Sequence, residues 1–214
     1  MQRFERVLAI GAHTDDVELG CGAFLSRLVD QGVNVMVAAF SRAEAGLPPG
    51  AASDTLEREF RASMACLGLA DAQIFMGAIP VREFPAHRQG ILDELVSIGR
   101  AFDPDLVLTM SSTDTHQDHE VIHQESVRAF RGRTVLGYEI PWNQRTQTLD
   151  LFVEVRRRDI ERKAAMLACY ESQAQLSRSY VGSDFVLSSG TFRGLQARCD
   201  FAEAYEVITM KWAI

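Results

Sequence analysis

Residues 7–22 have the sequence VLAIGAHTDDVELGCG, which carries the strongest indication of the fold. Four apolar residues form a buried-strand pattern that Gly11 ends, and Asp15 and Asp16 follow within a few residues. From Asp16 onward, apolar side chains recur at steps of three and four residues, which is the spacing of one helix face. The stretch therefore predicts a strand, a polar turn and a helix in direct succession.

The same alternation of strand and helix patterns continues along the chain. Further strands are expected at residues 33–40, 74–76, 106–110, 134–140, 151–155 and 205–211, and helices at 16–31, 54–67, around 91–102, around 122–129 and at about 156–170. Strands that alternate with helices indicate βαβ units and right-handed crossovers. We therefore expect residues 1–214 to form a single α/β domain, with a Rossmann-like, mostly parallel sheet flanked by helices.

Composition and charge argue against a nucleic-acid-binding protein and against a membrane-spanning one. The chain has 22 basic and 29 acidic residues, a formal charge of −7, which argues against a nucleic-acid partner. The sequence contains no apolar run near the roughly 18 residues that a membrane span needs. Its start has no signal-peptide pattern, and its four cysteines form no CxxC pair. We expect a cytoplasmic protein without a membrane span, and the sequence leaves a homo-oligomer open.

A second polar motif, Asp114-Thr-His-Gln-Asp-His119, follows the predicted strand 106–110. Open parallel sheets bind ligands at the carboxyl ends of their strands, near the point where the strand order reverses. If this strand and strand 7–10 are both central, the two motifs converge there. Imidazole and carboxylate ligands suit zinc, iron(II), cobalt or manganese. Helix capping is the alternative role for the aspartates of the first motif taken alone.

Taken together, the two motifs resemble those of the LmbE-like/PIG-L family of zinc-dependent N-acetylglucosaminyl deacetylases. The hallmarks of that family are an AH-(P)-DD motif after the first strand and an HxDH motif after a later one. The resemblance runs from Arg6 to Ala129 and continues more loosely at residues 202–206. It implies that His13, Asp16 and His119 are metal ligands and that Asp15 is a general base. It also implies that His116 polarises the carbonyl or protonates the leaving amine, and that Asp118 orients an imidazole.

The chain departs from the family pattern at three positions. Thr14 replaces a proline, Leu56 stands where an arginine often precedes Glu59 by three residues, and Phe201 stands where a tyrosine is common. Arg58, close to the missing arginine, is our candidate for contact with the substrate. Arg42, which follows the second predicted strand, is a further candidate.

The resemblance implies a metal-dependent hydrolase that uses metal-activated water and the Asp15 base. It would remove an N-acetyl group from an amino-sugar-type substrate, a small molecule or a glycan. Zn²⁺ is the expected cofactor, with Fe²⁺, Co²⁺ and Mn²⁺ as alternatives. Two other functions stay open at this point. One is an amidase that acts on another acyl group or on a thiol-conjugate amide, and the other is a non-catalytic module that binds a sugar or nucleotide.

Overall fold

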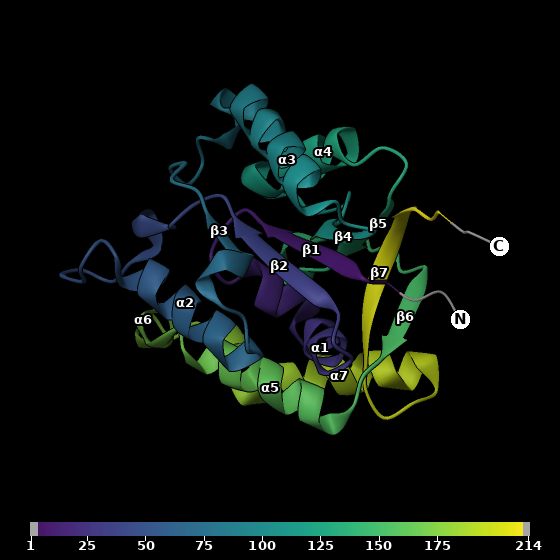
Figure 1. Ribbon diagram of the computed structural model, residues 1–214. Helices are drawn as coiled ribbons and strands as arrows, with labels where there is room; N and C mark the ends of the chain where they lie inside the picture. Colours follow the sequence, from purple (N-terminus) through teal and green to yellow (C-terminus); the bar gives the residue numbers. More distant parts are fainter. Residues whose placement is uncertain (1–3, 212–214) are drawn as a thin grey trace.

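A seven-stranded sheet forms the centre of the computed structural model, which describes residues 4–211 (Figure 1). The strand order is β3-β2-β1-β4-β5-β7-β6. The first five strands in this order are parallel, and β7 runs antiparallel to both of its neighbours. The strands are β1 (Arg6–Gly11), β2 (Asn34–Ala39), β3 (Ile74–Met76), β4 (Leu106–Met110), β5 (Thr134–Tyr138), β6 (Leu151–Glu154) and β7 (Ala202–Thr209).

Helices cover both faces of the sheet. In Figure 1, α3 and α4 lie above it and pack on each other, whereas α1, α2, α5 and α7 lie below it, with α5 in contact with the other three. The helices are α1 (Asp16–Asp30), α2 (Thr55–Leu67), α3 (Arg88–Phe102), α4 (Gln117–Ala129), α5 (Arg157–Ala168), α6 (Glu171–Gln175) and α7 (Ser183–Ala197). The expected fold class, a mostly parallel α/β sheet flanked by helices, is confirmed.

The strand order reverses between β1 and β4. After β1 the chain builds β2 and then β3 on one side, and it returns to place β4 on the other side of β1. In the parallel pair, Val7 lies opposite Leu106 and Ala9 opposite Leu108. The carboxyl ends of β1 and β4 are therefore neighbours, as the sequence predicted, and the two polar motifs meet there.

The helix that follows β1 is bent and held from the far end of the chain. Its backbone leaves the helical conformation at Cys21 (φ −143°, ψ 15°). The buried carboxylate of Glu203 accepts hydrogen bonds from the N–H groups of Ala23 (3.1 Å) and Phe24 (2.8 Å), which start the second half of the helix. Lys163 Nζ pairs with the same carboxylate at 2.7 Å. Strand β7 thus fixes the helix whose first turn carries the predicted site.

Strand β7 also holds the loop that follows β4. The Glu206 carboxylate accepts hydrogen bonds from Ser111 Oγ at 2.9 Å, from Ser112 N at 2.7 Å and from Ser112 Oγ at 2.6 Å. These contacts join β7 to the loop after β4, and Ser112 and Glu206 are 94 positions apart in the sequence. The acidic residues of the segment 202–206 therefore have a positioning role in this fold.

The structure corrects the sequence-based elements in two places. The last strand covers Ala202–Thr209 rather than 205–211, because its first four residues pair with β6. Helices α6 and α7 were not expected. In α7 the side chains of Phe192 and Leu195 are exposed, so the apolar residues of this helix do not form one buried stripe. Among the described residues, no helix has the length and hydropathy that crossing a membrane requires.

Candidate metal centre and active site

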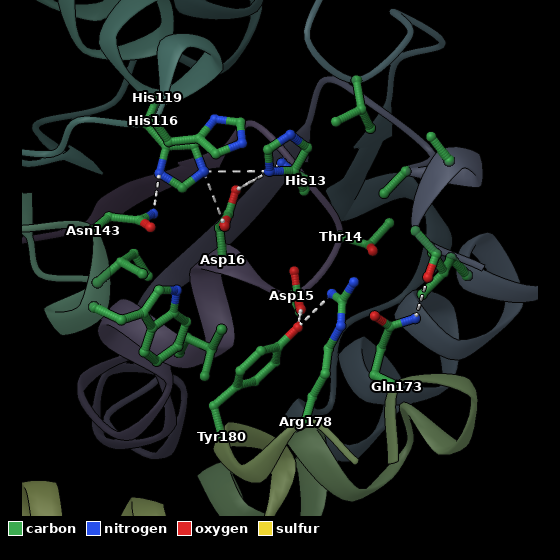
Figure 2. A pocket seen from close by; sticks show the side chains of 18 of the residues that line it. His13, Thr14, Asp15, Asp16, His116, His119, Asn143, Gln173, Arg178 and Tyr180 are labelled. Atoms are coloured by element: carbon green, nitrogen blue, oxygen red, sulfur yellow. Dashed lines mark hydrogen bonds and ion pairs between the residues drawn. The ribbon is translucent and has the colours of Figure 1, made fainter. Parts of the chain in front are cut away.

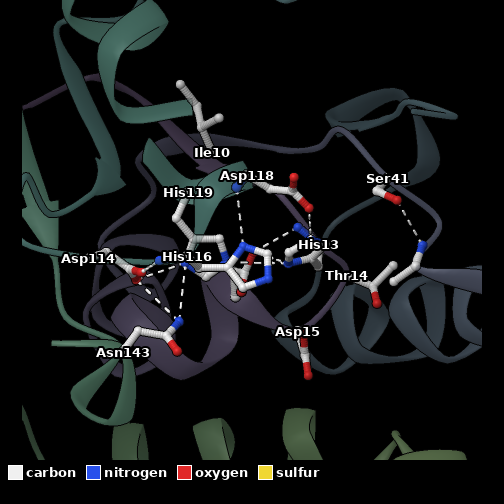
Figure 3. A network of polar contacts seen from close by, with 12 residues as sticks. Ile10, His13, Thr14, Asp15, Ser41, Asp114, His116, Asp118, His119 and Asn143 are labelled. Carbon is white, nitrogen blue, oxygen red and sulfur yellow. Dashed lines mark hydrogen bonds and ion pairs between the residues drawn. The ribbon is translucent and has the colours of Figure 1, made fainter. Parts of the chain in front are cut away.

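A pocket of about 400 Å³ lies at the edge of the sheet where β1 and β4 end (Figure 2). Five of the residues that the sequence singled out line it, namely His13, Asp15, Asp16, His116 and His119. Asp118 is fully buried behind them, in contact with His13 (Figure 3). The structure thus brings together all six residues to which the resemblance gives a role.

Three side chains present their polar atoms to one another at the base of the pocket. His13 Nδ1 and His119 Nε2 lie 3.3 Å apart. The two carboxylate oxygens of Asp16 complete the group, because Oδ2 is 3.4 Å from His13 Nδ1 and Oδ1 is 3.4 Å from His119 Nε2. The same carboxylate accepts the backbone N–H of His13 at 2.7 Å, which fixes its orientation.

A second carboxylate holds the outer nitrogen of each histidine. His13 Nε2 lies 3.0 Å from Asp118, and His119 Nδ1 lies 2.7 Å from Asp114 (Figure 3). Burial raises the pKa of Asp118, but hydrogen bonds from His13 and from the backbone of Arg82 lower it further, below its usual value. An ionised carboxylate only accepts, so each outer nitrogen must carry the proton. Carboxylates in this position typically orient the histidine ligands of metal sites.

This arrangement requires a positive charge at the base of the pocket. With their outer nitrogens protonated, neutral His13 and His119 turn lone pairs toward each other and toward Asp16. Burial lowers the pKa of His13, but Asp16 and Asp118 outweigh it and raise that pKa to about 10. Burial likewise raises the pKa of Asp16, yet His119 and His13 bring it well below its usual range. A bound proton or a divalent cation satisfies these groups, and two imidazoles with one carboxylate suit zinc.

His116 stands beside this group, at the start of α4. His13, His116 and His119 each have one ring nitrogen in a group whose atoms all lie within 4.8 Å of one another. The Nδ1 atom of His116 accepts the backbone N–H of Asp118 at 3.2 Å, so a neutral ring carries its proton on Nε2. Burial and the neighbouring histidines lower the pKa of His116. The site therefore offers a neutral donor here.

Asp15 faces the pocket without joining the histidine group (Figure 2). Burial and the neighbouring charge of Asp16 raise its pKa. Tyr180 donates a hydrogen bond to Asp15 Oδ2 at 3.1 Å, and Arg178 Nη1 donates to the Tyr180 hydroxyl at 2.8 Å. The Asp15 side chain makes no capping hydrogen bond to α1. Helix capping, the alternative role from the sequence, is therefore not what this carboxylate does.

The two arginines expected to contact the substrate are not among the residues that line this pocket. Arg42 pairs with Glu57 at 3.2 Å, and Arg58 is largely exposed and pairs with Asp54, which directly precedes α2. The pocket arginines are Arg82 and Arg178 instead.

Sequence reasoning missed three contributors to the site. Asp114 lay in the quoted motif, and its spacing of five residues from His119 is the signal that could have revealed its contact. Tyr180 and Arg178 belong to a loop without a motif, and only the fold brings them to Asp15. Phe201, where a family tyrosine was expected, lies instead against Arg157. The phenolic hydroxyl that contacts Asp15 in this pocket comes from Tyr180.

This chain forms a doubly wound α/β domain with a histidine–carboxylate cluster where the strand order reverses. It is similar to known proteins over most of its length. Residues 8–130 fit the family model described as "PIG-L: GlcNAc-PI de-N-acetylase", and the chain belongs to this family of de-N-acetylases. It is 31% identical over 176 residues to the Escherichia coli (strain K12) protein described as "Uncharacterized deacetylase YaiS". That match covers 78% of this chain and 90% of the relative.

Solved structures share the fold at lower identity. One is N,N'-diacetylchitobiose deacetylase from Pyrococcus horikoshii, with a TM-score of 0.79 and 17% identity, covering 96% of this chain and 84% of that one. Another is GalB, the 4-carboxy-2-hydroxymuconate hydratase from Pseudomonas putida KT2440, with a TM-score of 0.77 and 18% identity, covering 98% of each chain. The same fold thus carries different reactions, and the residues of the site determine which reaction it supports.

Proposed function

We propose that this protein is a metal-dependent hydrolase that removes an N-acetyl group from an amino-sugar-type substrate, releasing acetate and a free amine. One observation carries the proposal. The polar atoms of His13, Asp16 and His119 converge within 3.4 Å of one another, with the non-ligating carboxylate of Asp15 on the pocket side. Membership of a family of de-N-acetylases supports the reaction class.

His13, Asp16 and His119 would hold the ion, with Zn²⁺ as the proposed cofactor and Fe²⁺, Co²⁺ or Mn²⁺ as alternatives. When bound, such an ion polarises a carbonyl oxygen and lowers the pKa of water to about 7, so that hydroxide is available at neutral pH. Three protein ligands leave a coordination position open, as catalytic sites require. Asp114 and Asp118 keep the two imidazoles in the ligating tautomer.

Asp15 is the proposed general base. It lies next to Asp16 in sequence and lines the pocket, so its carboxylate can reach a water molecule there. Its raised pKa brings it closer to the range in which a carboxylate accepts and returns a proton at neutral pH. After accepting the proton of the attacking water, Asp15 can pass it to the nitrogen of the leaving amine. The hydrogen bond from Tyr180 orients the carboxylate for both steps.

His116 is proposed to stabilise the oxygen that becomes negative when the amide carbonyl is attacked. Its lowered pKa keeps the ring neutral, and the hydrogen bond from the Asp118 backbone leaves Nε2–H as the donor. Preorganised donors aimed at a developing oxyanion typically contribute 100-fold to 1000-fold to the rate, roughly 3 to 4 kcal/mol. The proposed role of His116 is therefore that of a neutral hydrogen-bond donor to this oxygen.

Release of acetate from a panel of N-acetyl sugars tests the proposal. Protein stripped with a chelator is assayed with and without added zinc, beside Asp15→Asn and, as a matched control, the exposed Asp93→Asn on α3. We expect acetate that depends on zinc, is lost in Asp15→Asn and is retained in Asp93→Asn. A different carboxylic acid as product would indicate another amidase. Sugar binding without turnover, unchanged by Asp15→Asn, would contradict the proposal and indicate a binding module.

A further inference from the structure

The wall of the pocket opposite the histidine cluster comes from the part of the chain outside the family match. The family model ends at residue 130, whereas this wall includes Trp142, Gln173, Arg178 and Tyr180. In Figure 2, Tyr180 and Arg178 rise from below toward Asp15, on the side away from His116 and His119. The matched part thus supplies the reacting groups, and this wall supplies contacts for the rest of a substrate.

Arg178 brings a positive charge into the pocket without a carboxylate to neutralise it. Its Nη1 atom donates to the Tyr180 hydroxyl at 2.8 Å. Its Nη2 atom lies near the backbone turn at Gly46, where a Cβ added to this glycine would be 3.9 Å away from it. Within residues 4–211, no carboxylate forms an ion pair with Arg178, whereas Arg193 pairs with one carboxylate and Arg156 with two. A half-buried guanidinium without an anion is costly, because burial removes water that would otherwise solvate its charge.

A second arginine lines the pocket from the loop after β3. The backbone of Arg82 has φ 74° and donates its N–H to Asp118 at 2.7 Å. Arg82 is an exposed residue at the pocket, and across the described residues its guanidinium forms no ion pair. Two arginines whose guanidinium groups have no carboxylate partner among the described residues therefore line one pocket, in a chain with a net charge of −7.

The wall also offers an aromatic surface, and the matched part of the pocket offers a hydroxyl without a hydrogen-bond partner among the described residues. The rings of Trp142 and Tyr180 stack with centroids 4.8 Å apart and planes at 16°, and Trp142 is 49% exposed. Such faces suit the C–H face of a sugar ring. Thr14, which lines the pocket beside Asp15, is 1% exposed, and its Oγ1 has no hydrogen-bond partner among the residues described. A polar group of a ligand would supply that partner.

We infer that the substrate of this site is an N-acetylated sugar that carries a carboxylate or phosphate group, and that Arg178 binds this anion with support from Arg82. The inference rests on the proposed function and names its substrate class. Tyr180 lies between Arg178 and Asp15 in the hydrogen-bond chain, so the anion can approach through Nη2 rather than toward the Asp15 carboxylate. Guanidinium binds carboxylate and phosphate through paired hydrogen bonds, so both anions share this chemistry.

Matched sugars that differ only in charge test the inference. Acetate release is measured for methyl N-acetylglucosaminide, its carboxymethyl counterpart and N-acetylglucosamine 1-phosphate. The variants are Arg178→Gln, Thr14→Val and, as a charge-matched control, Arg100→Gln on α3, which is exposed and outside this pocket. We expect an anionic sugar to exceed the neutral one in kcat/KM by about tenfold or more, because charge-assisted hydrogen bonds are the strong ones. The anionic sugar with the higher kcat/KM, carboxymethyl or 1-phosphate, identifies the charged group that the site prefers.

In Arg178→Gln the preference for the anionic sugar should fall to near unity while acetate is still released, and Arg100→Gln should keep the wild-type ratio. Thr14→Val should lower kcat/KM for the anionic and neutral sugars without removing the preference. An anionic-to-neutral ratio that is unchanged by Arg178→Gln would overturn the inference and leave deacetylation standing.

Binding of sugars without an amide separates the two proposals. Methyl glucoside, carboxymethyl glucoside and glucose 1-phosphate cannot release acetate, so calorimetric titration of the zinc-loaded wild-type protein measures recognition alone. Tighter binding of an anionic glucoside, lost in Arg178→Gln, would support the inference even if no N-acetyl sugar were hydrolysed. Equal binding of all three glucosides, or equally weak binding, would contradict it whatever the outcome of the activity assay.

Discussion

The imidazoles of His13 and His119 meet at 3.3 Å although the residues are 106 positions apart in sequence. The parallel pairing of β1 with β4 brings them together, because it places both strand ends at one edge of the sheet. A carboxylate behind each ring then turns the facing nitrogens into acceptors. The fold therefore brings acceptor groups together at this point, where a bound proton or a divalent cation would satisfy them.

Replacing His119 by alanine should remove tightly bound metal. The variant loses the Nε2 atom that faces His13 and Asp16, and two ligands hold zinc far less tightly than three. Metal content after dialysis, measured by mass spectrometry, should fall from about one equivalent to near zero. His87→Ala, at an exposed position outside the pocket, is the control and should keep its metal. Full metal content in His119→Ala would exclude this ligand.

Asp15→Asn should keep the metal and lose turnover. The side chain faces the pocket and is not one of the converging ligand groups, so the amide preserves the shape while it removes the base. Loss of general base catalysis typically lowers kcat by a factor of about 100 to 10,000. The measurement is kcat at saturating substrate together with metal content. Near wild-type kcat in this variant would remove Asp15 from its role.

Asp114→Asn and Asp118→Asn should each weaken zinc binding by about tenfold to 100-fold, because each removes a carboxylate that orients a ligating imidazole. Competition against a chromophoric chelator gives the dissociation constant. Asp93→Asn on the surface of α3 is the control for the change of aspartate to asparagine. If both site variants bind zinc as tightly as the control, the tautomer argument for this centre is wrong.

Glu203→Gln should destabilise the whole domain. The change leaves Lys163, whose Nζ lies 2.7 Å from this carboxylate, as an unpaired buried charge. It also weakens the acceptor for the two N–H groups at the bend in α1. Breaking a buried pair in this way costs about 3–5 kcal/mol. Urea unfolding measures the difference, with the exposed Glu154→Gln as a control, and a loss below about 1 kcal/mol would contradict this role.

Asp159 should make part of the stability of the protein sensitive to acid. Burial raises the pKa of Asp159, but hydrogen bonds from Arg156 and Ser26 lower it further, below its usual value. The unfolded chain then takes up the proton at a higher pH than the folded protein does. The stabilisation is therefore present above about pH 4 and is lost as the pH falls, with a slope of at most about 1.4 kcal/mol per pH unit.

Comparison with Asp159→Asn isolates this contribution. The difference in free energy of unfolding between wild type and variant should be largest near neutral pH and should shrink steadily below pH 4. The exposed Asp200→Asn is the matched control and should follow the wild-type pH dependence. A difference for Asp159→Asn that stays constant between pH 6 and pH 2 would show that the pKa of this carboxyl is not lowered in the folded state.

The sequence predicted the half of the site that local patterns encode. Strand β4 and the motif after it were expected where they occur, because a fully apolar run followed by clustered polar residues has few alternative structures. The expected convergence of His13 and His119 followed from parallel topology alone. Membership of the family is confirmed, and it covers this same half of the chain.

The remaining half depends on contacts that no local pattern records. Tyr180 reaches Asp15 through a loop that precedes α7, and α7 itself lacks a one-sided apolar stripe. Arg42 and Arg58 were expected at the substrate site from their positions in the sequence. In the structure, Arg42 pairs with Glu57 on α2 and Arg58 with Asp54 at the start of α2, and neither arginine lines the pocket. Long-range packing determines which arginine reaches a pocket, and Arg178 is the example here.

Whether this site is a catalytic zinc centre is measured by titrating chelator-treated protein with zinc and following acetate release and metal content on the same samples. We expect activity on an N-acetyl sugar to rise in proportion to bound zinc and to level off at about one equivalent. We also expect His119→Ala to show no such rise. Full acetate release by metal-free protein would contradict this expectation, and so would stoichiometric zinc binding in the His119→Ala variant.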